Sequence, residues 1–251
     1  MMRRWSLLFA TALLGLAGCS SFHQNPILKK VELEKGYRLE NIDRYPHPSK
    51  KNSEKTFFVL TLSGGGTRAA ALAFGVMKHL QETKIRSDRS VLDEVDVISS
   101  VSGGSFAAAF YGAFGEEIFF QDFRKVVLDR KIQSSLIRRV LSPWNWPRLW
   151  SPKFGRSDLL NEFYDRKIFG GKTYANMPRK KPVIILNSTD MSLGAQFSFI
   201  QEHFDRLCSD LDGVQVSRAV ISSSAFPGAF TPLTFDNHNK SKTACGYVAP
   251  T

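Results

Sequence analysis

The feature that most constrains this chain is a strand-like run that ends in a cluster of serine and glycine residues and leads at once into a helix-prone run. Residues 95–98 are largely apolar and β-branched, which predicts a short strand. Residues 106–113 are small and apolar and favour a helix. Between them, residues 99–105 read Ser-Ser-Val-Ser-Gly-Gly-Ser. This order is the context of a nucleophile elbow, in which a serine hydroxyl stands above the edge of a sheet.

The serine at the tip of such an elbow needs small residues two positions before it and two positions after it, because the turn is crowded there. Ser102 meets this requirement with Ser100 and Gly104. Ser105 also has small neighbours, but it falls inside the predicted helix. We therefore predict that Ser102 is a nucleophile. The alternative is an ordinary turn rich in serine and glycine after a strand.

A glycine-rich loop follows another predicted strand, earlier in the chain. Residues 56–62 are almost all apolar or β-branched, which predicts a parallel strand buried on both faces, and residues 69–80 predict a helix. The loop at 63–68 reads Ser-Gly-Gly-Gly-Thr-Arg. A dinucleotide site is disfavoured because the next strand does not end in an acidic residue, and a P-loop would need Gly-Lys-Ser/Thr. The third interpretation is an oxyanion hole, in which glycine amides approach a reacting carbonyl.

Segments that predict strands and helices alternate along the rest of the chain. Further strands are expected at 182–190 and 196–200, and further helices at 115–131, 157–167 and 212–221. The alternation predicts an α/β fold of three layers, α/β/α, with a mainly parallel central sheet. With 251 residues, of which 43% are hydrophobic, the chain is long enough for a sizeable core.

The first residues have the pattern of an export signal. Arg3 and Arg4 precede an apolar run, residues 5–14, that is too short to remain as a membrane-spanning helix. Residues 16–19, Leu-Ala-Gly-Cys, resemble a bacterial lipobox, in which Cys19 becomes lipidated after removal of residues 1–18. Ser20 favours sorting to the outer membrane, so we expect a lipid-anchored protein of the bacterial cell envelope, on the periplasmic side or the surface. The alternative is a plain signal peptide with an incidental cysteine.

The segment after the export signal differs in composition from the rest of the chain. Residues 19–54 are polar, charged and contain several prolines, which predicts a tether. The domain itself is expected at 55–251. No internal repeat is evident.

Two cysteines remain after Cys19, namely Cys208 and Cys245. Exported proteins meet an oxidising environment, which favours a disulfide between such a pair. Two buried free thiols are the alternative.

The charge of the chain points to anionic partners. The formal net charge is +11, which favours a membrane surface with phospholipid headgroups, and no zinc-finger or RNA-binding motif suggests a nucleic-acid partner. Residues 132–156 hold five basic residues, no acidic residue, and Trp144, Trp146 and Trp150. Interleaved tryptophan and basic side chains are typical of a membrane–water interface. The alternatives are a lid, or a proline-rich loop whose rings pack on the core.

Several blocks, taken in order, resemble the patatin-like phospholipases. They are residues 63–68, the elbow at Ser102, the Asn-Ser-Thr-Asp segment at 187–190, and the Ser-Ser-Ala-Phe-Pro-Gly-Ala-Phe run at 223–230. The resemblance covers about residues 55–251. It implies a patatin-like, modified α/β-hydrolase fold and a lipid acyl hydrolase. It also implies a phospholipid or lysophospholipid substrate, a Ser–Asp dyad, no catalytic histidine and no cofactor.

The resemblance assigns roles to individual residues of this sequence. Ser102 is the expected nucleophile, and the amides of Gly64, Gly65 and Gly66 are the expected oxyanion hole. Arg68 is expected to shape this loop or to hold an anionic group. We expect no metal site, because the histidines at positions 23, 47 and 79 have no ligand partners at a useful spacing.

One expected block is missing. The family's catalytic Asp lies in an Asp-Gly-Gly or Asp-Gly-Ala motif after the Ala-Phe-Pro block, whereas residues 212–214 here read Asp-Gly-Val and precede it. We therefore expect a domain incomplete at its C-terminus and a chain that is inactive by itself. Asp190 and Asp236 are substitutes for this catalytic Asp only in principle. Ser102, Asp190 and either His203 or His238 have the order of a Ser…Asp…His triad, with isolated surface histidines as the alternative. The competing function is a catalytically inactive lipoprotein docked to the membrane.

Overall fold

The central sheet is mainly parallel. The computed structural model describes residues 24–47, 52–53, 55–130, 142–150, 154–226, 228, 230–240 and 245–248. Its main sheet has the strand order β1-β4-β5-β6, with bounds Phe58–Leu62, Val95–Val101, Val183–Asp190 and Ala195–Ser198. The first three strands run parallel, and β6 returns antiparallel to β5. The predicted α/β fold is thereby confirmed.

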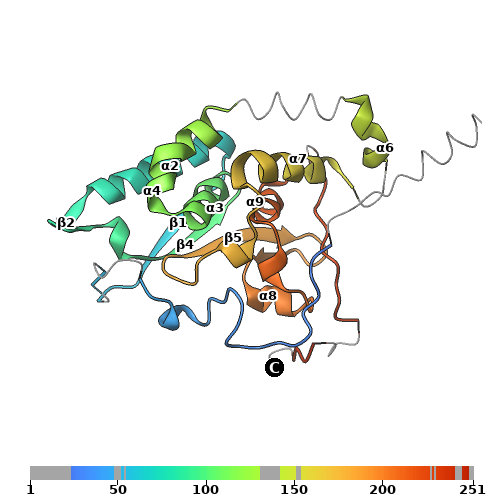
Figure 1. The fold of residues 1–251 in the computed structure, drawn as a ribbon, viewed down its shortest axis with the longest axis horizontal. Helices are drawn as coiled ribbons and strands as arrows, with labels where there is room; N and C mark the ends of the chain where they lie inside the picture. Colours follow the sequence, from blue (N-terminus) through green and yellow to red (C-terminus); the bar gives the residue numbers. More distant parts are fainter. Residues whose placement is uncertain are drawn as a thin grey trace, which may run out of the picture.

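Most helices cover one side of this sheet, as Figure 1 shows. They are α2, α3, α4, α7 and α9, which span Gly66–Glu82, Gly103–Phe114, Glu116–Phe123, Arg156–Tyr164 and Val216–Ser224. The short helix α8, Gln201–Asp205, lies on the other side. The chain steps from β1 to β4 to β5 in one direction, and right-handed crossovers then place the connecting helices on one face. The other strands and α-helix of the described residues are the hairpin strands β2 (Lys84–Arg86) and β3 (Arg89–Ser90) and the helix α6 (Trp146–Leu149), and short 3₁₀ and π-helical turns also occur.

Strand β1 differs from its prediction. It was expected to be buried on both faces, but it lies at the edge of the sheet formed by the described residues. Leu62 is buried, whereas Val59 is 42% exposed and Phe57, just before the strand, is 63% exposed. Val59 and Thr61 share one face of the strand and are both exposed, whereas Phe58, Leu60 and Leu62 on the other face pack on the core. The prediction was wrong because an apolar run reports hydrophobicity but not whether other elements cover both faces of the strand.

Part of the predicted tether packs on the domain. Residues 24–47 run along the same side of the sheet as α8 (Figure 1). Tyr37 and Arg38 are each only 1% exposed. The Tyr37 hydroxyl accepts a hydrogen bond from the Ile184 amide at 2.6 Å, and the Arg38 guanidinium lies 2.8 Å from the Asp205 carboxylate. These residues therefore belong to the folded unit.

A disulfide joins two segments that lie far apart in the sequence. Cys208 and Cys245 are bonded, with their Cα atoms 5.6 Å apart. The amide of Leu28 donates to the Cys208 carbonyl, and the amide of Val31 donates to the Cys245 carbonyl. The disulfide and the N-terminal segment thus hold the same part of the molecule together.

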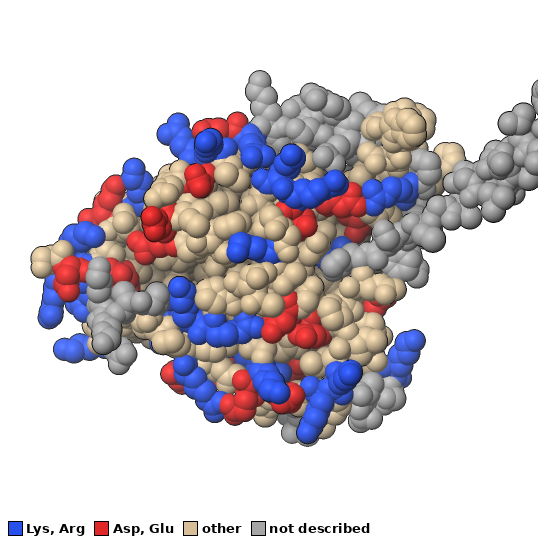
Figure 2. Space-filling model, viewed as in Figure 1, with Lys and Arg blue, Asp and Glu red and all other residues tan. Residues whose placement is uncertain are grey.

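The surface charge is spread rather than concentrated on the face that Figure 2 shows. Lys and Arg side chains are distributed across this face, with Asp and Glu side chains among them (Figure 2). The net charge of +11 therefore does not form a single basic patch there.

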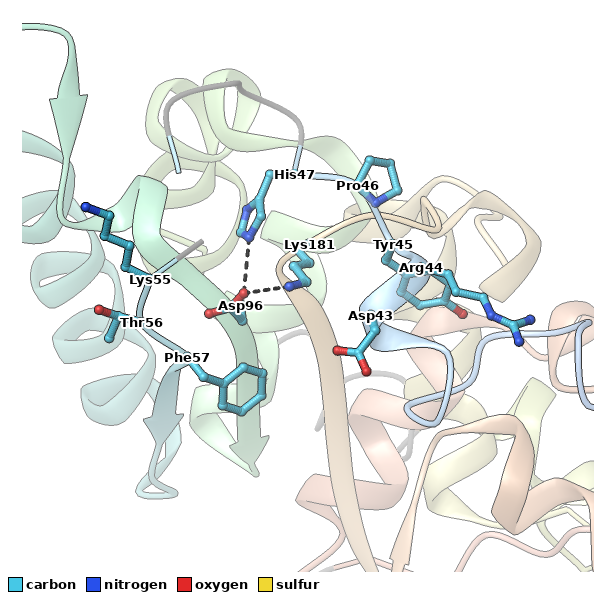
Figure 3. Close-up of a pocket in the computed structure, with 10 residues that line it drawn as sticks. All are labelled: Asp43, Arg44, Tyr45, Pro46, His47, Lys55, Thr56, Phe57, Asp96 and Lys181. Carbon is cyan, nitrogen blue, oxygen red and sulfur yellow. Dashed lines mark hydrogen bonds and ion pairs between the residues drawn. The ribbon is translucent and has the colours of Figure 1, made fainter. Parts of the chain in front are cut away.

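A buried cluster of ion pairs lies where strands β1, β4 and β5 begin (Figure 3). Asp96 of β4 is 3% exposed and borders a cavity of about 550 Å³. Its carboxylate accepts hydrogen bonds from the Phe58 amide at 2.8 Å and from the Lys181 ammonium at 2.9 Å, and it contacts His47 Nε2 at 3.1 Å. Burial raises the pKa of Asp96, but these hydrogen bonds outweigh burial and hold the pKa below its ordinary value.

The Asp96→Asn variant should lose stability in a pH-dependent way. Because the folded-state pKa is depressed, the carboxylate contributes stability above its unfolded pKa, and this contribution is lost as the pH falls through the folded pKa. We expect a loss of about 3 kcal/mol at pH 7, since the substitution removes the buried counter-ion of Lys181. Urea unfolding at a series of pH values measures this difference, which should shrink below about pH 4. A loss that stays constant with pH, or an equal loss in the exposed control Asp88→Asn, would contradict the assignment.

Candidate active site

Ser102 occupies a sharp turn between β4 and α3. It follows Val101, the last residue of β4, and precedes Gly103, the first residue of α3. Its backbone dihedrals are φ 50° and ψ −118°. Among the described residues other than glycine, only Ser102 and Cys208 have a positive φ. Such a strained conformation at a strand-to-helix junction is typical of the serine in a nucleophile elbow.

The two glycines after Ser102 are required by close packing. A Cβ atom on Gly103 would lie 2.2 Å from the carbonyl oxygen of Gly66, and one on Gly104 would lie 2.7 Å from the carbonyl oxygen of Leu62. The Gly104 amide also donates to the Ser63 carbonyl at 3.2 Å. The start of α3 therefore lies directly against the end of β1 and the glycine-rich loop.

The glycine-rich loop brings backbone amides to the elbow. A Cβ atom on Gly64 would lie 3.1 Å from Ser102 Cβ and 3.7 Å from its Oγ. Gly65 and Gly66 have φ values of +134° and +64°, which side chains of other residues disfavour. These dihedrals let α2 begin at Gly66 rather than at the predicted Ala69, and the amides of its first turn have no acceptor within the helix. The Gly66 nitrogen lies 2.9 Å from where a Cβ atom of Gly103, the residue after Ser102, would stand. Amides in this place can stabilise an oxyanion. Arg68 is exposed on the same turn.

The aspartates considered for a triad do not contact Ser102. Within the described part of the chain, no carboxylate is hydrogen-bonded to the Ser102 hydroxyl. Asp190, at the end of β5, accepts hydrogen bonds from the amides of Ser192 at 2.8 Å and Leu193 at 3.3 Å. Asp236 donates its amide to the Asn25 side chain at 2.6 Å. Asp190 therefore caps a local turn.

The histidines considered for a triad have other partners. His203 Nδ1 accepts a hydrogen bond from the Ser198 amide at 3.0 Å, and burial lowers the pKa of His203. His238 Nε2 lies 3.1 Å from the Asn25 carbonyl oxygen. The described residues therefore contain no assembled Ser–Asp–His triad around Ser102.

The sequence did not point to a second serine that contacts the backbone of Ser102. The Ser223 hydroxyl, near the end of α9, accepts a hydrogen bond from the Ser102 amide at 2.8 Å. It also lies 2.9 Å from the Ser105 hydroxyl and donates to the Asn187 carbonyl at 2.5 Å. The only signal in the sequence was that Ser223 begins one of the blocks that carried the resemblance. Nothing in that block indicates which serine would reach the elbow.

The three tryptophans of the segment around α6 point into solvent. Trp144 is 90% exposed, Trp150 is 87% exposed and Trp146 is 51% exposed. Their segment is held to α7 by an ion pair between Arg148 and Glu162. This exposure does not fit the alternative in which the rings pack on the core. The neighbouring residues 131–141 and 151–153 lie outside the described residues, as do residues 1–18 and Cys19.

The described residues offer neither a cluster of metal ligands nor a helix able to span a membrane. The described residues hold no group of three or more His, Cys, Asp or Glu side chains placed to bind a metal ion. Among the helices that are described, none combines the length and the hydrophobicity needed to cross a bilayer.

Comparisons with known proteins agree with the geometry of the elbow. Residues 60–248 match the model of a family described as patatin-like phospholipase. This range contains the glycine-rich loop, Ser102 and the block around Ser223. A search of curated proteins found no match.

Proposed function

Because the chain belongs to the patatin-like phospholipase family, we propose that it is a serine hydrolase that cleaves fatty-acyl esters of phospholipids or lysophospholipids through Ser102. Family membership itself implies a lipid acyl hydrolase. The observation that supports the finer proposal is the close approach of Gly64 to Ser102, where a Cβ atom built on Gly64 would lie 3.1 Å from Ser102 Cβ, together with the φ of 50° at Ser102. Labelling with a fluorophosphonate tests this proposal: the wild-type protein should be labelled, and the Ser102→Ala variant should not.

The chemistry follows from this arrangement. The Ser102 oxygen attacks the acyl carbonyl carbon, and the carbonyl π electrons move to oxygen. The amides of Gly64, Gly65 and Gly66 stabilise the resulting oxyanion. When the oxyanion collapses, the alcohol leaves with the proton that the base had taken from Ser102, and an acyl-enzyme remains. Water then attacks the acyl-enzyme and gives a proton to the base. The bond between the acyl carbon and the Ser102 oxygen breaks, the base returns the proton to this oxygen, and the fatty acid leaves.

We propose that the base is an Asp in the family's Asp-Gly-Gly or Asp-Gly-Ala motif, located outside residues 1–251. The Asp-Gly pair within these residues is a poor substitute, because Asp212 lies in a turn before α9 and forms an ion pair with Arg179. Reading the coding sequence beyond codon 251 tests this assignment. A full-length protein without such a motif would favour the catalytically inactive lipoprotein, which binds vesicles without turnover.

We further propose that two features hold the domain at a membrane. Removal of residues 1–18 would leave a lipidated Cys19, which favours the outer membrane of a bacterial envelope. Asn25 is buried against the domain. The six-residue stretch of chain from Cys19 to Asn25 can span at most about 20 Å. The domain would therefore lie close to the lipid surface, where the exposed rings of Trp144 and Trp150 can insert among headgroups.

Vesicle binding tests the tryptophan contact. Because a lipid anchor would mask weaker contacts, the test uses the Cys19→Ser protein and anionic phospholipid vesicles. Replacing Trp144, Trp146 and Trp150 together with alanine should weaken partitioning by at least about tenfold, since burying each ring stabilises the bound state. A matched control replaces Leu33 and Ile85, which are 63% and 47% exposed, with alanine. Equal binding of the tryptophan variant and this control would reject the contact.

A further inference from the structure

Helix α9 ends in three consecutive serines that make different contacts. The Ser222 hydroxyl donates to the Arg218 carbonyl at 2.9 Å, and the Ser224 hydroxyl donates to the Val220 carbonyl at 2.8 Å. Both bonds lie within α9. Ser223 instead reaches out of the helix to the end of β4 and the end of β5.

The hydrogen-bond inventory around Ser223 has one consistent solution. A hydroxyl has one hydrogen to donate and two lone pairs that accept. The Asn187 carbonyl can only accept, so it takes the Ser223 hydrogen. The Ser102 amide can only donate, so the Ser223 oxygen accepts from it. The contact with Ser105 must then use the Ser105 hydrogen. The Ser100 hydroxyl has one hydrogen and two acceptors within reach, the Ser105 oxygen at 3.1 Å and the Ile185 carbonyl at 3.3 Å. Ser100 and Ser105 are 2% and 0% exposed, so water does not compete for these bonds.

The Ser102 amide needs such a partner. It stands between the end of β4 and the first turn of α3, and among the described residues its hydrogen-bond acceptor is the Ser223 oxygen. Strained dihedrals persist only where the surroundings hold them in place. Ser223 also binds Asn187, which is paired with Val101 in the parallel sheet. One hydroxyl therefore links α9, β5 and the turn that carries Ser102.

We infer that Ser223 is a positioning residue that holds the backbone of the nucleophile at the dihedrals required for attack. This inference rests on the proposed hydrolase function. Without the hydroxyl, the Ser102 amide and the Asn187 carbonyl lose their shared partner, and the turn can relax toward unstrained dihedrals. The Ser102 oxygen would then move relative to the amides of the glycine-rich loop. Turnover should fall, whereas substrate binding, in which Ser223 has no part, should remain.

The test compares Ser223→Ala with Ser222→Ala and Ser224→Ala in the full-length protein. We expect Ser223→Ala to lower kcat, and the rate constant of fluorophosphonate labelling, by about tenfold, with KM unchanged. The two neighbouring variants also remove one hydroxyl from α9, and they should keep wild-type values. Ser223→Cys, which keeps the volume but offers a weak acceptor, should behave like Ser223→Ala and provides a second variant if alanine prevents folding. Thermal unfolding of each variant shows that folded protein is compared.

Three results would overturn the inference. One is a wild-type kcat in Ser223→Ala or Ser223→Cys. Another is an equal loss of kcat in the Ser222→Ala and Ser224→Ala controls, which would indicate a general effect on α9. The third is a change in KM alone. A wild-type protein that neither hydrolyses esters nor reacts with the fluorophosphonate would instead refute the proposed function itself, and the inference would fall with it.

Discussion

Replacing Ser102 with alanine should abolish ester hydrolysis and fluorophosphonate labelling in the full-length protein. The hydroxyl is the only group of this residue that can form the acyl-enzyme, and removal of a nucleophile that acts together with its base costs on the order of 10⁶ in kcat. Alanine carries a Cβ atom as serine does, so it keeps the φ of 50° at about the same strain, and little change in stability is expected. Initial rates with a short-chain ester and gel-based detection of the label measure the effect.

The control for this variant is Ser224→Ala. It removes a hydroxyl that bonds only within α9, so both activity and labelling should remain. Labelling that persists in Ser102→Ala would show that another residue reacts with the probe. The assignment of the elbow would then be wrong, whatever the activity of the intact protein.

Replacing Gly64 with alanine should have the second largest effect, a loss of about 10²–10³ in kcat, comparable to the loss of an oxyanion donor. The new methyl group would lie 3.1 Å from Ser102 Cβ and 3.7 Å from its Oγ, so the loop or the serine must shift. Gly64 has an ordinary φ, so the alanine backbone is not strained there. The loss should therefore come from displacement of the amides relative to the nucleophile.

Gly75→Ala is the matched control for this prediction. Gly75 lies in α2, and a Cβ atom there would meet no other group within 4 Å. Alanine in a helix interior is more favourable than glycine, so this variant should be slightly more stable and fully active. A Gly64→Ala protein with wild-type kcat would mean that the loop does not bind the oxyanion.

Much of the fold could be predicted from the spacing of residues that are close together in the sequence. The strand, the Ser-Gly turn and the helix around Ser102 were predicted because all three signals come from residues close together in the chain. The same holds for the glycine-rich loop between β1 and α2. By contrast, the edge position of β1, with Val59 42% exposed, depends on which strands pair, and hydrophobic periodicity does not contain this information.

Long-range partners explain why part of the predicted tether is folded. Residues 24–47 are polar and contain prolines, and on composition alone they resemble a linker. Tyr37 and Arg38 are nevertheless buried, because Ile184 supplies a hydrogen bond and Asp205 supplies the opposite charge. Both partners lie more than a hundred residues further along the chain, where no local pattern links them to this segment.

The sequence alone determined the α/β class, the serine at the strand-to-helix turn and the glycine loop suited to an oxyanion, because each follows from the order of neighbouring residues. Only the tertiary structure decided that Ser223 supports the Ser102 amide and that Asp190 caps a turn. It also decided that Trp144 and Trp150 face solvent. Hydrogen bonds between distant segments depend on distances and angles in space, and these emerge only when the packed core brings the segments together.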